Sequence, residues 1–162
     1  MVTSSELRRI GVADTMFSRG DMGAVAVRTI KASGKPVEIV RYTVPGIKDL
    51  PVACKKLFFD HGCDIVIATG MVGGKPVDKQ CGHEASLGIQ SVQISASRHI
   101  LEVFVHEDES AGDDVRLAEI MADRTEKHAQ NALDLLFNPA SLTLRAGTGQ
   151  RQGGPNASRV RL

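Results

Sequence analysis

The octapeptide Val44-Pro45-Gly46-Ile47-Lys48-Asp49-Leu50-Pro51 joins a strand pattern over residues 37–43 to a helix pattern over residues 52–58. Its two prolines fix φ and restrict the residues before them, while Gly46 permits a backbone path that a side chain would obstruct. Pro51 suits the first turn of a helix, where its missing N–H is not needed. In a parallel α/β sheet such a loop lies at the carboxyl end of a strand, where ligands bind. The octapeptide is therefore either a rigid turn with solvated charges or part of a ligand site.

Strand and helix patterns alternate along the rest of the chain. The expected strands span residues 10–13, 37–43, 63–69 and 100–105, and a glycine-rich loop is expected over residues 70–76. The expected helices span residues 21–32, 77–96 and 113–137, together with the segment from Val52 to a glycine stop at Gly62. The third strand is nearly continuously apolar after Asp64, which is typical of a strand covered on both faces. The sequence therefore predicts an α/β fold: a flavodoxin-like three-layer sandwich with a four-stranded parallel sheet in the order 2-1-3-4.

The length and composition fit one globular domain. Residues 1–153 are expected to form it, followed by a flexible tail over residues 154–162. Residues 138–162 are rich in Gly, Arg, Asn, Gln and Pro and are expected to be irregular. The net charge of +1 and the 4% of aromatic residues argue against a nucleic-acid-binding protein.

The sequence also bears on location and redox chemistry. No apolar run reaches the roughly eighteen residues that span a bilayer, and the polar first residues lack an apolar signal core. We therefore expect a cytoplasmic protein without a membrane partner. The cysteines fit no CxxC pattern. Cys54 and Cys63 are expected to fill core space, whereas Cys81 lies near the suspected site, with a nucleophilic role as the weaker interpretation.

Self-association is expected from the sheet and from the last helix. Four strands leave two open sheet edges. The last helix carries alanines that allow another helix to approach closely: Ala118, Ala122, Ala129 and Ala132. A homo-oligomer would bury these surfaces.

The octapeptide fits the pattern V-P-G-x-x-[DE]-L-P, and the chain resembles the lumazine synthase group from Gly11 to about Gly153. Within that group it is most similar to the archaeal-type riboflavin synthases. The resemblance implies a homopentamer with sites between neighbouring subunits. It also implies a transferase reaction in which two molecules of 6,7-dimethyl-8-ribityllumazine give riboflavin and 5-amino-6-ribitylaminopyrimidinedione. No organic cofactor is expected, and Mg²⁺ is a candidate requirement.

The implied reaction depends on how two substrate rings are placed. The methyl group on C7 of the ring is already acidic, because its anion delocalises into the ring. Holding the rings in register can supply about 7–11 kcal/mol of the barrier, whereas a positioned acid or base adds roughly 10²–10⁴-fold. We therefore expect positioning to contribute more than acid–base catalysis.

The resemblance assigns substrate-binding residues in the first two loops. Phe17 would stack on a ring, with a hydrophobic plug under the loop as the alternative. Gly46, Ile47, Lys48 and Asp49 would bind the ring edge and the ribityl hydroxyls. Lumazine synthases usually have glutamate where this chain has Asp49, so the reach of the carboxylate differs.

The third loop separates two branches of the group. Lumazine synthases have a Gly-[Glu/Asp]-Thr phosphate cradle and a histidine here, because they bind a phosphorylated four-carbon sugar. This chain has a segment over residues 71–79 that is about two residues shorter and lacks that threonine and that histidine. Met71, Val72 and Asp78 are carried over as substrate-binding residues. The missing cradle favours a riboflavin synthase, whose substrates carry no phosphate, over a lumazine synthase.

Lys79 and His83 are catalytic candidates on the next helix. They lie four residues apart and thus share a face, with Glu84 beside them in the segment Glu84-Ala85-Ser86-Leu87-Gly88, which resembles a turn shared across the group. The histidine could shuttle a proton and the lysine could stabilise an anionic ring oxygen. Helix-surface hydrogen bonding is the alternative for both.

The fourth strand and the last helix supply the remaining candidates. Glu102 aligns with positions that contact a neighbour's ligand, or it pairs with a cation. His106 ends the strand and is a catalytic candidate. The acids that follow it are consecutive, which makes a common metal site unfavourable, so no protein-bound metal is expected. Arg124 and His128 share a stripe of the last helix and are substrate-binding candidates, with plain interfacial hydrogen bonding as the alternative.

Three other functions have weaker support. A flavodoxin-type flavin carrier needs a hydroxyl- and glycine-rich loop after the first strand, and residues 14–19 fit this poorly. A phospho-receiver domain needs an aspartate at the end of the third strand, where this chain has Ala68-Thr69-Gly70. A catalytically silent oligomeric scaffold is the third.

Overall fold

The computed structural model, which describes residues 7–162, confirms the predicted α/β sandwich. All strand pairs are parallel, in the order β2-β1-β3-β4. The strands are β1 (Arg8–Thr15), β2 (Val37–Val44), β3 (Ile65–Val72) and β4 (Ile100–His106). The helices are α1 (Met22–Ala32), α2 (Leu50–Phe59), α3 (Pro76–Ala96), α4 (Asp114–Phe137) and α5 (Ala140–Leu144), with 3-10 turns η1 (Ile47–Asp49) and η2 (Glu107–Ser110).

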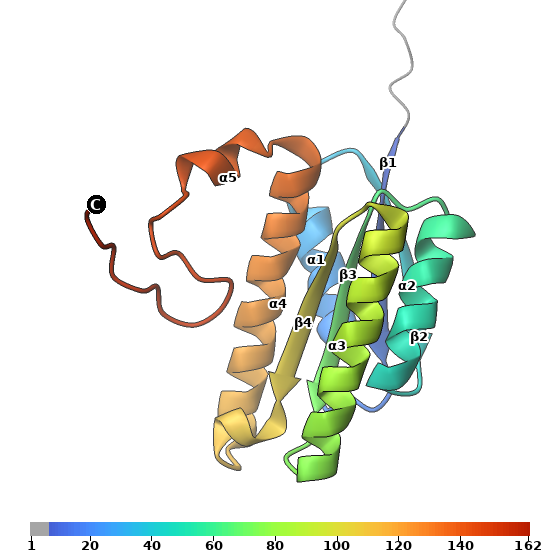
Figure 1. Ribbon diagram of the computed structural model, residues 1–162, viewed down its shortest axis with the longest axis vertical. Helices are drawn as coiled ribbons and strands as arrows, with labels where there is room; N and C mark the ends of the chain where they lie inside the picture. Colours follow the sequence, from blue (N-terminus) through green and yellow to red (C-terminus); the bar gives the residue numbers. More distant parts are fainter. Residues whose placement is uncertain (1–6) are drawn as a thin grey trace, which may run out of the picture.

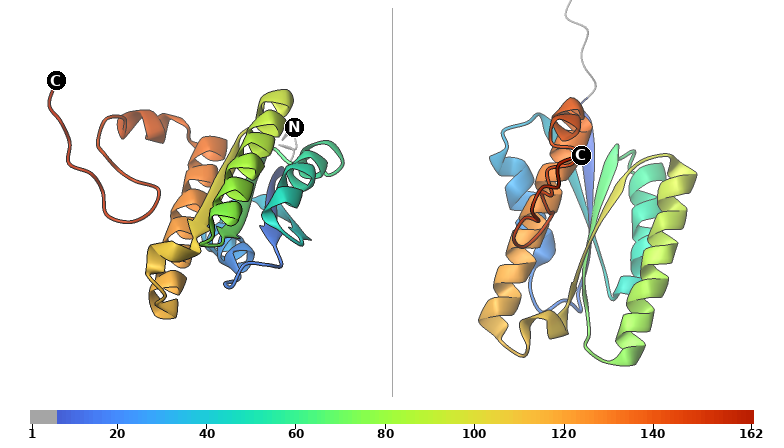
Figure 2. Two further views of the ribbon diagram at one scale, coloured as in Figure 1. Left: turned by 60° about the horizontal axis from the view of Figure 1, so that its bottom comes forward. Right: turned by 60° about the vertical axis from the view of Figure 1, so that its left-hand side comes forward.

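Helices cover both faces of the sheet (Figures 1 and 2). Helices α1 and α4 pack together on one face, and α2 and α3 pack together on the other. Strand β3 lies inside the sheet and all eight of its residues are buried, as expected for a strand covered on both faces. None of the helices described for residues 7–162 is long and apolar enough to cross a membrane.

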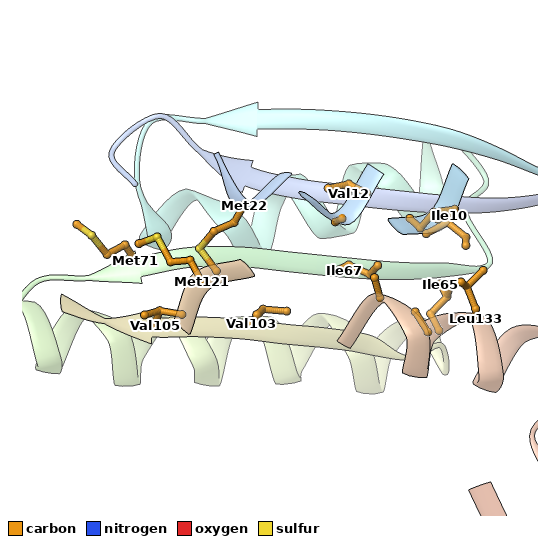
Figure 3. Packing of buried hydrophobic residues seen from close by; sticks show 14 of the residues in the cluster. Ile10, Val12, Met22, Ile65, Ile67, Met71, Val103, Val105, Met121 and Leu133 are labelled. Carbon is orange, nitrogen blue, oxygen red and sulfur yellow. The ribbon is translucent and has the colours of Figure 1, made fainter. Parts of the chain in front are cut away.

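Each face of the sheet has its own hydrophobic core. The core under α1 and α4 includes Ile10, Ile67 and Val103, and Figure 3 shows Met22, Met71 and Met121 together at the carboxyl end of its strands. The core under α2 and α3 includes Leu57, Phe58 and Val66 together with the thiols of Cys54 and Cys63. Both cysteines are free and buried, which confirms their predicted place in the core.

The predicted end of the third strand at Thr69 was wrong, since β3 continues to Val72. Gly70 makes this possible, because a Cβ there would lie 2.7 Å from Ile47 Cγ2 and 3.2 Å from Phe104 Cε1. Pairing with β4 also continues, with Val72 opposite His106. Met71 and Val72 therefore belong to the sheet and not to a loop.

The segment after α4 is partly regular, in contrast to the irregular structure predicted for it. Helix α5 follows α4, and the Arg145 guanidinium donates to the Asp134 carboxylate over 2.5 Å. Further along, the Gly154 N–H donates to Asp123 over 2.8 Å, and Lys127 donates to the Gly154 carbonyl over 3.1 Å. These bonds fix part of the C-terminal segment against α4. The flexibility of residues 154–162 stays a prediction.

Strand β4 is an edge strand, and side chains bind its outer backbone groups. Its first N–H, that of Ile100, donates to Gln93 Oε1 over 2.6 Å. The carbonyl of Phe104 accepts from the Arg124 guanidinium over 2.9 Å. Such bonds occupy groups that an approaching strand would otherwise use.

Candidate active site

A cavity of about 210 Å³ lies at the carboxyl edge of the sheet, where the loops after β1, β2 and β3 meet. We refer to it as the carboxyl-edge cavity. It is lined by Phe17, Gly46, Ile47, Lys48, Asp49, Met71, Gly73, Asp78 and Cys81. Seven of these are predicted substrate-binding residues, so residues predicted from three separate segments of the chain lie around one space.

Phe17 lies on the loop after β1, and backbone bonds hold that loop against the octapeptide. The Met16 N–H donates to the Val44 carbonyl over 2.8 Å, and the Phe17 N–H donates to the Pro45 carbonyl over 3.1 Å. The Phe17 side chain is nevertheless 61% exposed. An aromatic ring that is exposed beside a cavity is available for stacking on a flat ligand.

Met71 connects the cavity to the hydrophobic core. It is only 2% exposed and packs with the core residues under α1 and α4 (Figure 3). Because it also lines the cavity, the end of β3 supplies an apolar surface there. Val72, the next residue, is fully buried and lies under α3, where a Cβ on Gly82 would be 3.1 Å from its methyl groups.

The three loops that follow β2, β3 and β4 are closed in the same way. In each, a carboxylate accepts a hydrogen bond from the backbone N–H three residues before it. This is the bond that the acid at the third helical position makes to the N-cap residue in a capping box. The bonds are Gly46 N–H to Asp49 (3.2 Å), Lys75 N–H to Asp78 (3.1 Å) and His106 N–H to Glu109 (2.9 Å). The loops are therefore ordered by their own acids.

Asp78 also determines the charge at the start of α3. A Cβ on Gly73 would overlap the Asp78 carboxylate, so glycine is required for that carboxylate to lie across the loop. The N-terminus of a helix favours an anion, and here a carboxylate of the protein already provides it. An anionic ligand group would meet repulsion at this point of the cavity.

Lys48 reaches from the octapeptide to α3. Its ammonium group lies 2.6 Å from Glu84 Oε2, and Gln80 donates to the other Glu84 oxygen over 3.1 Å. The hydrogen bond to Glu84 raises the pKa of Lys48 and lowers the pKa of Glu84, so both are charged near neutral pH. Lys48 is therefore held as a cation at the cavity.

The segment Glu84–Gly88 lies within α3 and connects that helix to its neighbours. Ser86 donates to Glu102 on β4 over 2.6 Å. Gly88 allows close contact with α2, because a Cβ there would lie 2.7 Å from Pro51 Cγ. Together with the Glu84–Lys48 pair, these contacts give Glu84, Ser86 and Gly88 structural roles. Burial raises the pKa of Glu102, although the bond from Ser86 acts in the opposite direction.

Several predicted residues lie around β4 and α4, away from the lining of the carboxyl-edge cavity. Arg124 binds Glu109 with two hydrogen bonds of 2.9 and 2.6 Å. His128 is buried, its Nδ1 lies 2.7 Å from the Arg124 carbonyl, and desolvation lowers its pKa. His106 is half-buried at the end of β4.

On α3, Lys79 and His83 are both exposed. The Lys79 ammonium lies 2.6 Å from the Asp108 carboxylate, whose pKa it lowers. Within residues 7–162, the lining of the cavity includes neither of them, nor Val72, Glu102, His106, Arg124 or His128.

The acids after His106 do not gather around one point. Glu107, Asp108 and Glu109 each face a different cation. In the part of the chain that the structure describes, no group of three or more His, Cys, Asp or Glu side chains is arranged to hold a metal ion.

Two lining residues, Gly73 and Cys81, were missing from the predicted substrate-binding set, although Cys81 was expected to lie near the site. Cys81 follows Asp78 by three residues on α3, and this helical spacing could have indicated a shared face. Gly73 lies in the predicted glycine-rich segment, but its contact with Asp78 depends on the loop conformation.

Larger hollows occur elsewhere on the surface. One of about 790 Å³ lies at the amino end of the sheet and includes Arg9, Glu38 and Phe137. Another, of about 720 Å³, lies between α1 and β2. Ligands of open α/β sheets bind at the carboxyl ends of the strands, so size alone does not identify the site.

Comparison with known proteins places the chain among related sequences. A family model described as 6,7-dimethyl-8-ribityllumazine synthase matches residues 8–139. The riboflavin synthase of Methanothermobacter thermautotrophicus is 50% identical over 150 residues, which cover 92% of this chain and 97% of that protein. Those of Archaeoglobus fulgidus and Aeropyrum pernix are 48% and 42% identical over 153 residues, which cover 94% of this chain and 98% and 97% of those proteins.

Proposed function

Because the chain belongs to the 6,7-dimethyl-8-ribityllumazine synthase family, we propose that it is the riboflavin synthase form of that fold. The reaction is the transfer of a four-carbon unit between two molecules of 6,7-dimethyl-8-ribityllumazine, which gives riboflavin and a ribitylaminopyrimidine. The observation that carries the proposal is the identity of 42–50% to proteins named riboflavin synthase, over more than nine-tenths of the chain.

The start of α3 supports this branch over lumazine synthase. A lumazine synthase would have to bind a phosphorylated sugar near this loop. Here the Asp78 carboxylate accepts from the N–H of Lys75, the residue just before α3, and lines the cavity. A phosphate dianion would be repelled, whereas an uncharged ribityl chain can donate hydroxyl hydrogen bonds to the carboxylate.

The cavity residues fit one substrate ring. Phe17 provides an aromatic face, and Met71 provides an apolar floor. Lys48 places a cation where negative charge on a ring oxygen would be stabilised. Asp49 and Asp78 can accept from ribityl hydroxyls, and their backbone bonds fix their orientation beforehand.

The size of the cavity supports a site completed by a second copy of the chain. About 210 Å³ is less than the roughly 300–1,000 Å³ typical of a ligand site, and the reaction needs two ligands. We assign Glu102, His106, Arg124 and His128 to the neighbouring subunit's part of the site, because on their own subunit they lie away from the cavity lining. This is the homopentameric arrangement that the family resemblance implies.

Exposed apolar side chains on α2 and α3 also favour assembly. Val52 and Phe59 on α2 and Leu87 and Ile94 on α3 are 51–76% exposed. Such side chains are commonly covered in oligomers. Light scattering should give five times the 17.4 kDa mass of one chain, and a monomeric mass in an active sample would contradict the shared site.

His83 and His106 are the candidates for proton transfer. Their single replacement by glutamine should alter the pH dependence of kcat if either acts as acid or base. Unchanged profiles would remove both from that role. The Mg²⁺ requirement and the cytoplasmic location stay predictions, and the first is tested by assays with and without EDTA.

One assay tests the function directly. The purified protein is incubated with 6,7-dimethyl-8-ribityllumazine alone, and riboflavin is followed by its fluorescence. We expect riboflavin and the pyrimidine in equal amounts. Turnover only with added pyrimidine and the phosphorylated four-carbon sugar would instead identify a lumazine synthase. Visible absorbance of the purified protein, without turnover, would favour a flavin carrier.

A further inference from the structure

The three acids of η2 connect parts of the chain that are distant in sequence. We refer to Glu107, Asp108 and Glu109 as the acidic turn. Each carboxylate pairs with a cation from a different element of the fold. The pairs are Arg19–Glu107 (2.9 Å), Lys79–Asp108 (2.6 Å) and Arg124–Glu109 (2.6 Å).

Two of these pairs lead directly to the carboxyl-edge cavity. Arg19 lies two residues after Phe17 on the loop after β1, and it also pairs with Asp114 at the start of α4 over 2.8 Å. Lys79 follows Asp78 in the first turn of α3. The acidic turn therefore holds both the loop of the stacking residue and the helix end that carries the anion-repelling carboxylate.

The third pair fixes the acidic turn itself. Arg124 binds both oxygens of Glu109 and also donates to the Phe104 carbonyl at the end of β4. These side chains are the least exposed of the three pairs, at 26% for Arg124 and 31% for Glu109. A two-pronged bond of this kind restricts orientation as well as distance.

We infer that the acidic turn is a positioning element of the active site, and that Lys79 acts through it as a positioning residue. The inference rests on the proposed function. The Lys79 ammonium forms an ion pair with the Asp108 carboxylate at 2.6 Å, and among residues 7–162 the lining of the cavity does not include Lys79. Its role is to fix the first turn of α3, so that Asp78 faces the ligand together with Phe17.

The Lys79–Asp108 pair is expected to affect the position of ligand-binding groups more than the folding stability of the protein. The Lys79 and Asp108 side chains are 49% and 47% exposed, and pairs of this exposure contribute little to folding stability. Displacement of a group that binds substrate and transition state equally, in contrast, raises KM and leaves kcat unchanged. Loss of the pair should therefore change substrate binding more than the melting temperature.

A charge swap provides the test. We expect Asp108→Lys, which places two cations together, to raise KM about tenfold with little change in kcat. The double variant Lys79→Asp with Asp108→Lys restores an ion pair of opposite direction. Its KM should return to within about threefold of the unsubstituted enzyme. A folded double variant as impaired as the single one would overturn the inference, since the Lys79 ammonium itself would then be needed. An unchanged KM in Asp108→Lys would also overturn it.

The pair Lys56–Asp60 is a matched control. Its side chains are 50% and 60% exposed, but it joins the last turn of α2 to the C-cap residue of the same helix and connects no separate loops. Asp60→Lys should leave KM and kcat unchanged. A KM increase as large as that of Asp108→Lys would show that the effect is one of general surface charge, which would contradict positioning.

A second readout does not depend on turnover. Amide hydrogen exchange of residues 16–20 and 73–78 should become faster in Asp108→Lys and should slow again in the double variant. If the enzyme forms no riboflavin but exchange follows this pattern, the proposed function fails while the positioning role stands. Unchanged exchange in both variants would contradict the positioning role itself.

Discussion

Ion pairs and hydrogen bonds of side chains occur at both ends of the sheet, but they connect neighbouring strands at the amino end and loops and helices at the carboxyl end. At the amino end, Arg9 pairs with Glu38, the residue directly opposite it on β2, over 2.7 Å. The Asp64 carboxylate accepts from the Arg9 N–H over 2.8 Å. At the carboxyl end, the acidic turn instead reaches the loop after β1, the start of α3 and the middle of α4. Bonds between paired strands stabilise a sheet, whereas bonds between loops fix the side chains that the loops carry.

The two ends of the sheet also differ in the size of their hollows. The hollow at the amino end has about 790 Å³, nearly four times the volume of the carboxyl-edge cavity. Among residues 7–162, the lining of the smaller space has two acids, Asp49 and Asp78, that are each bonded to the backbone of their own loop. Order in the lining, more than size, distinguishes a site prepared for a ligand.

The largest contrast should come from one carboxylate at each end. Asp78→Ala removes the acid that closes the third loop, and we expect kcat/KM to fall about 100-fold, because displaced groups no longer face the substrate. Asp64→Ala removes an acid of the same kind at the amino end. It should lower the free energy of unfolding by about 1 kcal/mol and leave kcat/KM unchanged. Steady-state kinetics and urea unfolding of both variants measure this contrast. Equal losses of activity in the two variants would contradict it.

Aromatic residues give the next largest effect. Phe17→Leu should raise KM about tenfold, because it removes a stacking face while keeping apolar volume. Phe137→Leu is the counterpart at the amino end, where the ring lies 5.6 Å from the Lys35 ammonium. It should leave KM unchanged. If the two variants bind substrate equally well, stacking on Phe17 is not part of binding.

Substitution of one glycine at each end of the sheet tests the role of the backbone there. Gly62 has φ +65°, so Gly62→Ala should lower the free energy of unfolding by about 1–2 kcal/mol without affecting turnover. Gly73→Ala would push the Asp78 carboxylate aside and should mainly affect turnover. Thermal unfolding and initial rates of both variants test this division, and it fails if Gly62→Ala is the more impaired enzyme.

The smallest expected effects are changes in folding stability with pH, in acid for a group at the carboxyl end of the sheet and in alkali for a group at the amino end. At the carboxyl end, the hydrogen bond from Arg124 lowers the pKa of Glu109, so its contribution to stability is present above its ordinary pKa near 4.5 and is lost as the pH falls further. At the other end, burial raises the pKa of the Cys63 thiol to about 11. The unfolded thiol ionises from about pH 9, so stability should decline as the pH rises above that value.

Urea unfolding from pH 3 to 10.5 measures both slopes. Glu109→Gln should reduce the slope on the acid side alone. Cys63→Ala should reduce the slope on the alkaline side alone, where the buried Cys54 thiol also contributes. A variant that changes the opposite side would contradict the assigned cause.

Much of the fold followed from the sequence, and the part that did not has a physical reason. Alternating patterns predicted the strand order, and the helix expected over residues 21–32 is α1, with Asp21 as its N-cap accepting from the Ala24 N–H. The end of β3 was missed because Gly70 was interpreted as the start of a loop. In the folded chain its missing side chain makes room for Ile47 and Phe104. Glycine alone does not distinguish these two cases.

The candidate site was predictable where its residues lie in local motifs. The octapeptide contains four lining residues: the place of a strand-to-helix loop in a parallel sheet suggested a ligand site there, and the family resemblance assigned the individual residues. The partners of Lys79 and Arg124 were not predictable. Both are bound by acids of a turn that comes close only when β4 pairs with β3. Those contacts depend on tertiary structure, which helical spacing does not contain.

The outer edge of β4 has a consequence for how copies of the chain can meet. Its backbone groups at Ile100, Phe104 and His106 already bond to the side chains of Gln93, Arg124 and Glu109. A strand from another molecule would have to break these bonds before it could pair with β4. Fibril-like stacking, which has no natural size limit, is thereby opposed, and contacts through side chains, which can close into a ring of fixed number, are favoured.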